Sequence, residues 1–422
     1  MEGSNNYNGE IGTWTSLYDS SGPVFNGRGE KKTMIFNDNN HYKQYRMTFV
    51  RNKNSSKIQM GHYGIIPAYT KECTAELYEK LTGLKLSAEL TSAPTNNPTS
   101  KPTLTPTNEP TTPKKPITDH LKTYALHYWF KGNRAFAIEQ YGRIEDWDTS
   151  LVTSMAGWFK QQPTFNDDIS KWNVSRVKSM SGIFLYATSF NVDIGAWNVN
   201  QVTTMQNMFL GATSFNANLG AWDVGNVKMM QSMFNSAKAF NGNISAWNVN
   251  RVSNMGSMFG GAESFNTNIG AWQVSKVYTM GGMFGNAKSF NNDVSAWDVS
   301  NVQNMNNMFQ KAESFNSDMG SWNVEKVTSM VSMFILTQNF NANIASWNVG
   351  KVPVFTSMFQ GSKSFNVDLS DWNVSHVRGF HYMFQDAESF DQTLCWKIEV
   401  GNANGSRGMF KNAKGGSVVC GI

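Results

Sequence analysis

Residues 190–214 have the sequence FNVDIGAWNVNQVTTMQNMFLGATS, and this 25-residue pattern recurs along more than half of the chain. Its tryptophan occurs ten times, from Trp147 to Trp372, with a constant step of 25 residues. Two phenylalanine columns keep the same step, one beginning at Phe159 and the other at Phe165. A repeat that holds its register without an insertion predicts a stack of equal structural units.

Two patterns of apolar residues occur within each unit. Ile194, Trp197 and Val199 have the L-x-x-L-x-L spacing of a leucine-rich-repeat strand, which points its apolar side chains inward. From Val202 to Ala212, apolar residues recur every three or four positions, as on one face of a short helix. A helix of this length is stable only when it packs on its neighbours. We therefore expect an α/β repeat solenoid of the leucine-rich-repeat type, with one short parallel strand and one short helix per 25 residues.

The composition agrees with such a stack. The chain has 422 residues, of which 16% are charged against ~25% in typical globular domains, and it contains 14 Trp, 28 Phe and 23 Met. These values exclude a mostly disordered chain and a highly charged coiled coil. The net charge is +5, and residues 144–394 carry 14 basic and 18 acidic side chains, so the charge gives no argument for nucleic-acid binding.

Composition divides the chain into five segments. Residues 88–116 are rich in Pro, Thr, Lys and Asn, which predicts an extended linker. We expect a small β segment over residues 1–87 before this linker and a helical cap over residues 117–146 after it. The repeats then occupy residues 147–394, and a C-terminal cap occupies residues 395–422.

Each column of the repeat has an expected structural role. The Trp and Phe columns bury the largest area and should stack as aromatic ladders in the core, with Met side chains filling the gaps between the rings. An Asn follows the second Phe column in nine copies, as Asn191 follows Phe190. This Asn is expected to satisfy backbone groups of a turn, although a stacked Asn column is also compatible with ligand binding.

One column, which we call the polar row, stays polar between the buried Trp and Val. On a strand with the L-x-L pattern this position faces solvent, so we expect the row to lie on the open face of a parallel sheet. Two interpretations remain open: a binding face for a polar ligand, and a solvated ladder whose amides pair along the stack. The candidate ligand-binding residues are Asn173, Asn198, Asp223, Asn248, Gln273, Asp298, Asn323 and Asn348, and Asp148 and Asn373 continue the row at its ends.

The repeat resembles the BspA-like leucine-rich-repeat surface protein family, whose repeats are DUF285-like. The resemblance rests on the motif Phe-Asn-x-Asp/Asn-Ile/Leu-x-x-Trp-Asn/Asp-Val-x-x-Val-x-x-Met-x-x-Met-Phe, over about residues 117–415. A lead-in helix containing Leu121 and Trp129 looks like the family's N-terminal cap. The resemblance implies a surface or secreted protein that acts in adhesion or recognition, and it carries no catalytic residues.

The three cysteines, Cys73, Cys395 and Cys420, are too few for a dense disulfide scaffold. Cys395 and Cys420 flank a loop of about 25 residues, the size of one coil, which a disulfide could close as a cap over the end of the stack. Such a bond would favour export from the cytosol. The alternative is a pair of buried thiols in a reducing compartment.

Residues 10–73 resemble the latter half of a discoidin-like (F5/8 type C) jelly roll. The resemblance rests on Phe25 to Gly29, Ile35 to Asn37, Tyr42 to Phe49 and Ile58 to Ile66. Tyr45, Met47 and Phe49 alternate with polar residues, as in a half-buried strand. Only about half of such a domain is present, so either the start is truncated and has lost a signal peptide with the first strands, or this piece is a degenerate remnant. We expect the truncated start, and with it an extracellular or cell-surface location.

No catalytic or metal-binding motif accompanies the repeat. His376 and His381 lack a third ligand at metal spacing, and nucleophile-elbow, Walker and dinucleotide motifs are absent. We therefore expect no enzyme activity, no cofactor, no metal, no nucleic-acid partner and no membrane span. The expected function is adhesion or recognition of a protein or polysaccharide ligand by a monomer. The alternative is a passive structural spacer or cell-wall component without a specific ligand.

Overall fold

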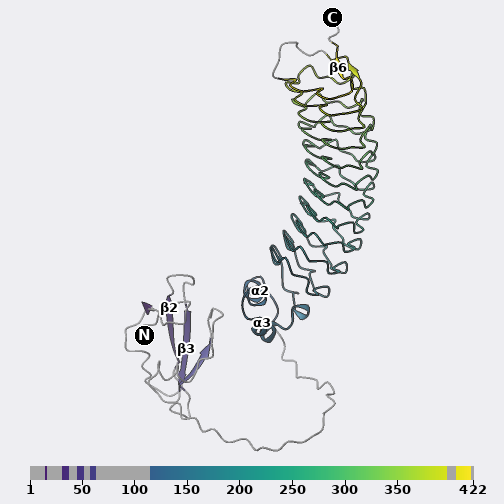
Figure 1. Cartoon of the computed structure of the whole chain (residues 1–422). Helices are drawn as coiled ribbons and strands as arrows, with labels where there is room; N and C mark the ends of the chain where they lie inside the picture. The colour runs from purple at the N-terminus through teal and green to yellow at the C-terminus, as the bar shows by residue number, and fades with distance from the viewer. Residues whose placement is uncertain are drawn as a thin grey trace, which may run out of the picture. The chain divides into compact units, whose positions relative to one another are not determined.

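The computed structural model describes residues 115–396 and 405–419, together with the backbone of four strands nearer the N-terminus. The chain divides into two compact units, Met1–Thr107 and Asn108–Ile422 (Figure 1). Most of the predicted β segment and nearly all of the predicted linker lie outside the described residues.

The first unit contains an antiparallel sheet with strand order β1-β2-β3-β4. Its strands are β1 (Thr15–Ser16), β2 (Lys31–Asn37), β3 (Tyr45–Arg51) and β4 (Ile58–His62). The register places Met34 opposite Met47, and Phe49 opposite Met60. The strand predicted from the alternation after Tyr45 is therefore confirmed as β3, and each strand pairs with its neighbour in sequence.

Two helices and a short turn open the second unit. They are α2 (Lys122–Phe130), α3 (Arg134–Tyr141) and the 3-10 helix η1 (Ile144–Asp146). The indole N–H of Trp129 donates to Asp167 at 2.9 Å, and Arg134 binds the same carboxylate at 3.2 Å. Phe130 packs edge-on against Phe159 and Phe165. The predicted helix around Trp129 is confirmed, and it covers the apolar end of the first repeat.

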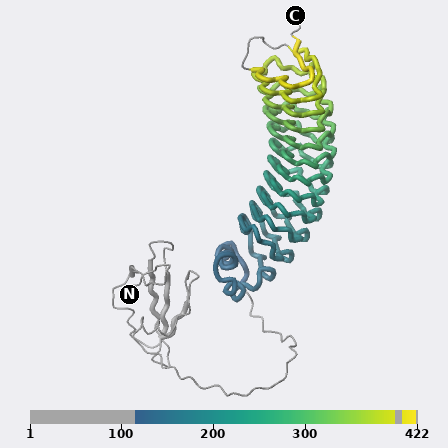
Figure 2. The backbone as a smooth tube through the Cα atoms, viewed as in Figure 1, coloured from purple at the N-terminus to yellow at the C-terminus, as the bar shows by residue number. Residues whose placement is uncertain are grey.

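Beyond η1 the chain winds into successive 25-residue coils that lie one on another (Figures 1 and 2). We call residues 147–396 the stack. In the coil of Trp197, four backbone N–H groups each donate to the carbonyl 24 residues further along the chain. The donors are the N–H groups of Met205, Asn207, Phe209 and Gly211, with N···O distances of 3.0, 3.0, 2.8 and 2.7 Å. Isolated parallel β-bridges join residues 25 apart at the same position of successive coils, as Ser179 joins Thr204. Backbone hydrogen bonds therefore fix each coil on the next.

The helix expected in each coil is absent from the stack. Met208, Leu210 and Ala212 donate to carbonyls three residues back, while the N–H groups between them donate to the next coil. Asn207 and Gly211 have positive φ angles of 56° and 71°, which an α-helix does not contain. The segment is therefore a series of tight turns whose alternate N–H groups join neighbouring coils.

The strand expected around each Trp is also absent, apart from β5 at the end of the stack. The Oδ1 atoms of Asp193 and Asn198 accept the N–H groups of Gly195 and Asn200 at 2.9 and 3.2 Å. These Asx turns give the backbone local partners that compete with a β ladder. The apolar side chains nevertheless face inward as predicted, and Trp197 is only 3% exposed.

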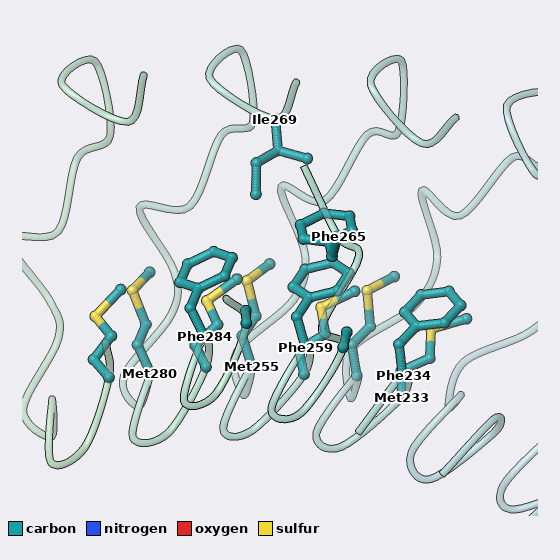
Figure 3. Close-up of a cluster of buried hydrophobic side chains, with 14 of the residues drawn as sticks. Met233, Phe234, Met255, Phe259, Phe265, Ile269, Met280 and Phe284 are labelled. Atoms are coloured by element: carbon teal, nitrogen blue, oxygen red, sulfur yellow. The ribbon is translucent and has the colours of Figure 1, made fainter. Parts of the chain in front are cut away.

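The Trp, Phe and Met columns form the core, as the sequence predicts, and Figure 3 shows the Phe rings in a row with Met side chains beside them. Phe234 stacks on Phe240 of its own coil at a centroid distance of 3.8 Å and on Phe259 of the next coil at 5.7 Å. Trp247 lies 6.3 Å from the Trp rings of both neighbouring coils. Its indole N–H donates to the carbonyl of Leu219 at 2.9 Å, so the ring also links two coils by a hydrogen bond.

The Asn column after the second Phe satisfies backbone groups, as predicted. Asn191 Oδ1 accepts the N–H of Asn216 at 2.8 Å, and Asn216 Oδ1 accepts that of Asn241 at 2.7 Å. The same link runs from Asn166 to Asp391, one coil at a time. The column is an asparagine ladder, and its oxygens are used within the fold.

A last partial coil follows the stack. Strand β5 (Thr393–Leu394) pairs in parallel with β6 (Ser417–Val418). Phe410 stacks on Phe384 at 5.5 Å. Trp396, one residue early in the repeat, still donates its indole N–H to Leu369 at 2.7 Å. The described part of the predicted C-terminal cap therefore continues the aromatic column.

The backbone ladder is interrupted at Pro353, which has no N–H to donate. Among the described residues, no bridge joins Ser329 to Val354, although bridges join the coils on both sides. The Met330 N–H also lacks the cross-coil bond that Met305 makes to Ser329 at 2.9 Å. We expect the Met330 amide to exchange with solvent faster than the Met305 amide, which hydrogen-exchange NMR measures directly. Equal protection of the two amides would contradict this account of the interruption.

Candidate binding surface

The polar row is exposed in every coil from Asp148 to Asn373. In nine of its ten members the side-chain oxygen accepts the backbone N–H two residues on, at 3.0–3.3 Å. Gln273 is the exception, because its longer side chain reaches back to the carbonyl of Ala271 instead. Each Asx turn fixes the orientation of its amide or carboxyl group, so the row is a regular series of polar groups held in place.

The predicted position of the row on a parallel sheet is wrong. The cross-coil hydrogen bonds begin about six residues after each Trp, as in the bond from Thr203 N–H to the Lys178 carbonyl at 2.9 Å. The row lies one residue after the Trp, where its members form Asx turns. Solvent exposure was predicted correctly, because the buried residues on either side of Asn198, Trp197 and Val199, force it outward.

A second exposed row, which we call the aspartate row, lies four residues before each Trp. Its side-chain oxygens also accept the N–H two residues on, at 2.8–3.0 Å. The sequence analysis missed this row as a site, although its motif contains Asp or Asn at this position. The members are Asp168, Asp193, Asn218, Asn243, Asn268, Asp293, Asp318, Asn343 and Asp368.

Serine residues keep several of these carboxyl groups ionised. The hydroxyl and backbone N–H groups of Ser300 lower the pKa of Asp298, with a smaller contribution from Lys326. The same two kinds of hydrogen bond, from Ser170 and Ser295, lower the pKa of Asp168 and of Asp293. The two rows therefore present fixed negative charges among neutral amides.

The Asp298→Asn variant tests this charge. Because the pKa is lower in the folded chain, ionised Asp298 stabilises the fold above its ordinary pKa of about 3.9, and this contribution is lost as the pH falls through the folded pKa. Asparagine keeps the turn but not the charge, so the stability difference between wild type and variant should shrink with falling pH in this window. Urea unfolding at a series of pH values measures it; a difference that does not vary with pH would contradict the assignment.

A shallow depression of about 470 Å³ lies on the turns that carry the cross-coil bonds. Glycines at 260, 261, 282 and 285 line it, together with Asn235 and Ser257, and the other coils have larger side chains at the shared position of Gly260 and Gly285. Lys238 and Glu263 also line it, and they form an ion pair at 3.0 Å. The sequence analysis missed this feature; the paired glycines in two successive copies are the signal that could have revealed it.

Other classes of site find no support in the described residues. No group of three His, Cys, Asp or Glu side chains there is placed to hold a metal ion. The described part of the chain also contains no helix that is long and apolar enough to cross a membrane. Cys395 is exposed and forms no disulfide in the structure, while Cys420 lies outside the described residues, so their pairing stays a prediction.

Comparison with known proteins places the stack in a family. A family model described as "Mycoplasma protein of unknown function, DUF285" matches residues 124–247, 230–338 and 315–418. No curated protein and no solved structure matches the chain. The matched segments together cover more than half of the 422 residues and include the polar row from Asp148 onward. The chain therefore belongs to the DUF285 family of repeat proteins.

Proposed function

We propose that the chain is a non-enzymatic recognition protein that binds a protein or glycan ligand through the polar row. The observation that supports this most is the row's regularity: in nine coils one polar group is exposed and held in the same Asx turn. Pre-oriented groups lose little conformational entropy when a ligand binds, so many weak contacts can add up. Amide N–H groups of the Asn members remain as donors once their oxygens bind the backbone.

The wider classification belongs to the same proposal. We assign the stack to the leucine-rich-repeat type of solenoid and to the BspA-like surface proteins, with an extracellular or cell-surface location. Residues 10–73 are proposed to be a discoidin-like segment. The N-terminal sequence pattern supports this last assignment, and the family match does not extend to it.

A passive structural spacer is the alternative function. One observation favours it: the oxygens of both rows already bind backbone N–H groups of their own coils, which lowers their capacity to accept from a ligand. The two functions differ in whether the exposed amide donors matter for binding.

Replacing Asn198, Asn248 and Asn323 together by Asp separates the two functions. Asp already occupies this row at Asp223 and Asp298, where the Asx turn is kept, so the triple variant should fold like the wild type. It loses three amide donors and gains negative charge. The full chain should bind at least one ligand on glycan and extracellular-protein arrays, and the variant should bind it at least about tenfold more weakly. A wild-type chain that binds nothing on such arrays supports the spacer, and unchanged binding by the variant removes the row from the site.

A further inference from the structure

Basic side chains gather in two adjacent columns of the stack, four and six residues after each Trp. We call these eight residues the basic strip: Arg176, Lys178, Lys228, Arg251, Lys276, Lys326, Lys351 and Arg378. All eight are exposed, and the Val between the two columns, which is buried in every coil except that of Val377, keeps both facing solvent. No acidic residue occupies either column in any of the ten coils, although residues 144–394 as a whole have more acidic than basic side chains.

The cations of the strip lack ion-pair partners within the described part of the chain, although Lys326 acts on Asp298 at longer range and helps to lower the pKa of that carboxyl group. None of the eight takes part in an ion pair there. Lysines elsewhere in the stack behave differently: Lys238 and Lys288 both bind Glu263, at 3.0 and 3.4 Å, and Lys363 binds Glu388 at 2.9 Å. Three lysines of the stack outside the strip are thus paired, whereas Lys160, Lys171 and Lys311 and all eight members of the strip form no ion pair there.

The fold also arranges the strip in a line. Arg251 donates to the Oδ1 of Asn226 at 2.6 Å and Lys326 to the Oδ1 of Asn301 at 2.7 Å, in each case a neutral amide of the preceding coil. These bonds hold the side chains along the direction of the stack. Cross-coil backbone bonds at the second column, such as Lys228 N–H to the Thr203 carbonyl at 2.9 Å, keep the spacing between coils constant.

From this arrangement we infer that the basic strip binds a linear anionic polysaccharide that carries sulfate or carboxylate groups. A line of cations without ion-pair partners, present in seven of the ten coils, complements a linear polymer that carries many anionic groups. A single-stranded nucleic acid is a poorer fit, because Tyr278 and His376 are the two aromatic rings in the two columns, four coils apart, and bases need several adjacent platforms. The inference rests on the proposed function, and it names the ligand class and adds residues beside the polar row.

Dextran sulfate is a suitable probe, with uncharged dextran as the reference polymer. The full chain should bind dextran sulfate and not dextran, and its Kd should rise at least about tenfold between about 0.05 M and about 0.5 M NaCl, because salt screens exposed charges. The variant Arg251→Gln/Lys276→Gln/Lys326→Gln should bind at least about tenfold more weakly. The matched control Lys238→Gln/Lys288→Gln/Lys363→Gln removes the same charge outside the strip and should keep near wild-type affinity.

Three results would overturn the inference: no binding of dextran sulfate at low salt, an equal loss of affinity in the two triple variants, or tighter binding of single-stranded DNA than of dextran sulfate. The Asn198→Asp/Asn248→Asp/Asn323→Asp variant separates this failure from failure of the proposed function. If an array ligand binds through the polar row while dextran sulfate does not bind, the inference alone fails. If neither an array ligand nor dextran sulfate binds, both fail.

Discussion

The Trp247→Ala variant is expected to lower the free energy of unfolding by about 3–5 kcal/mol. The indole is 3% exposed, stacks between the Trp rings of both neighbouring coils at 6.3 Å, and donates to the Leu219 carbonyl at 2.9 Å. Alanine leaves a cavity in the middle of the stack and removes that hydrogen bond. Because each coil contacts only its neighbours, the loss should weaken the coupling between the two halves of the stack. Urea unfolding followed by circular dichroism measures the change.

The Trp247→Phe variant is the control for this experiment. It keeps an aromatic ring in the column and removes the indole donor, so the cost should be clearly smaller than that of alanine, on the order of 1–2 kcal/mol. A Trp247→Ala variant as stable as the wild type would show that the tryptophan column does not hold the coils together.

The Gly211→Ala variant is expected to destabilise the chain by about 1–3 kcal/mol. Gly211 has a φ of +71°, which costs an L-amino acid free energy, and an added Cβ would lie 2.3 Å from Cδ1 of Tyr186 in the preceding coil. A second pair repeats the pattern: a Cβ added to Gly361 would lie 2.5 Å from Cδ2 of Leu336 in the preceding coil. Tyr186 and Leu336 are thus each followed by glycine at the same position of the next coil, whereas Lys311 is followed by Leu336, so the close approach is specific to these two pairs.

A double-mutant cycle separates the two costs. In a Tyr186→Ala background the ring contact is gone, so Gly211→Ala should cost only the backbone term. The Gly261→Ala variant is a second control, because Gly261 has a similar φ of +70° and faces Ser236 instead of a ring. If Gly211→Ala costs the same with and without the Tyr186 ring, the contact is energetically unimportant.

The sequence predicts the burial pattern well because the Trp column and the two Phe columns repeat without interruption. Trp197 and Phe209 are buried as expected, and the Asn191 column binds backbone groups as expected. Burial depends on side-chain type and position in the repeat, and both are visible in the sequence.

The local backbone was harder to predict. Asn207 adopts a positive φ, and Ser232 does so at the same position of the next coil. Glycine is the usual residue at a positive φ, so these two residue types do not mark it in the sequence as glycine would. The apolar spacing after Val202 fits a helix equally well, so the periodicity alone selects the wrong element. Positive φ at two positions per coil turns the N–H groups toward the next coil, and this arrangement depends on the stacked neighbours.

The candidate surface was predicted in part for a related reason. Exposure of Asn198 follows from its buried neighbours, but its Asx turn replaces the expected strand. The basic strip was overlooked because the charge count over residues 144–394 averages it with the acidic side chains. Charges sorted by column, such as Arg251 and Lys276, become visible only when the units are aligned and placed side by side.

The most direct test of the recognition account is the affinity of graded variants of the polar row for whichever array ligand the wild type binds. One variant carries Asn248→Asp alone, one carries the three substitutions at 198, 248 and 323, and one adds Asn173→Asp and Asn348→Asp. If the coils act together as one extended surface, affinity should fall stepwise through the series while stability stays near that of the wild type. Equal affinity across the series would contradict the claim that this row binds the ligand.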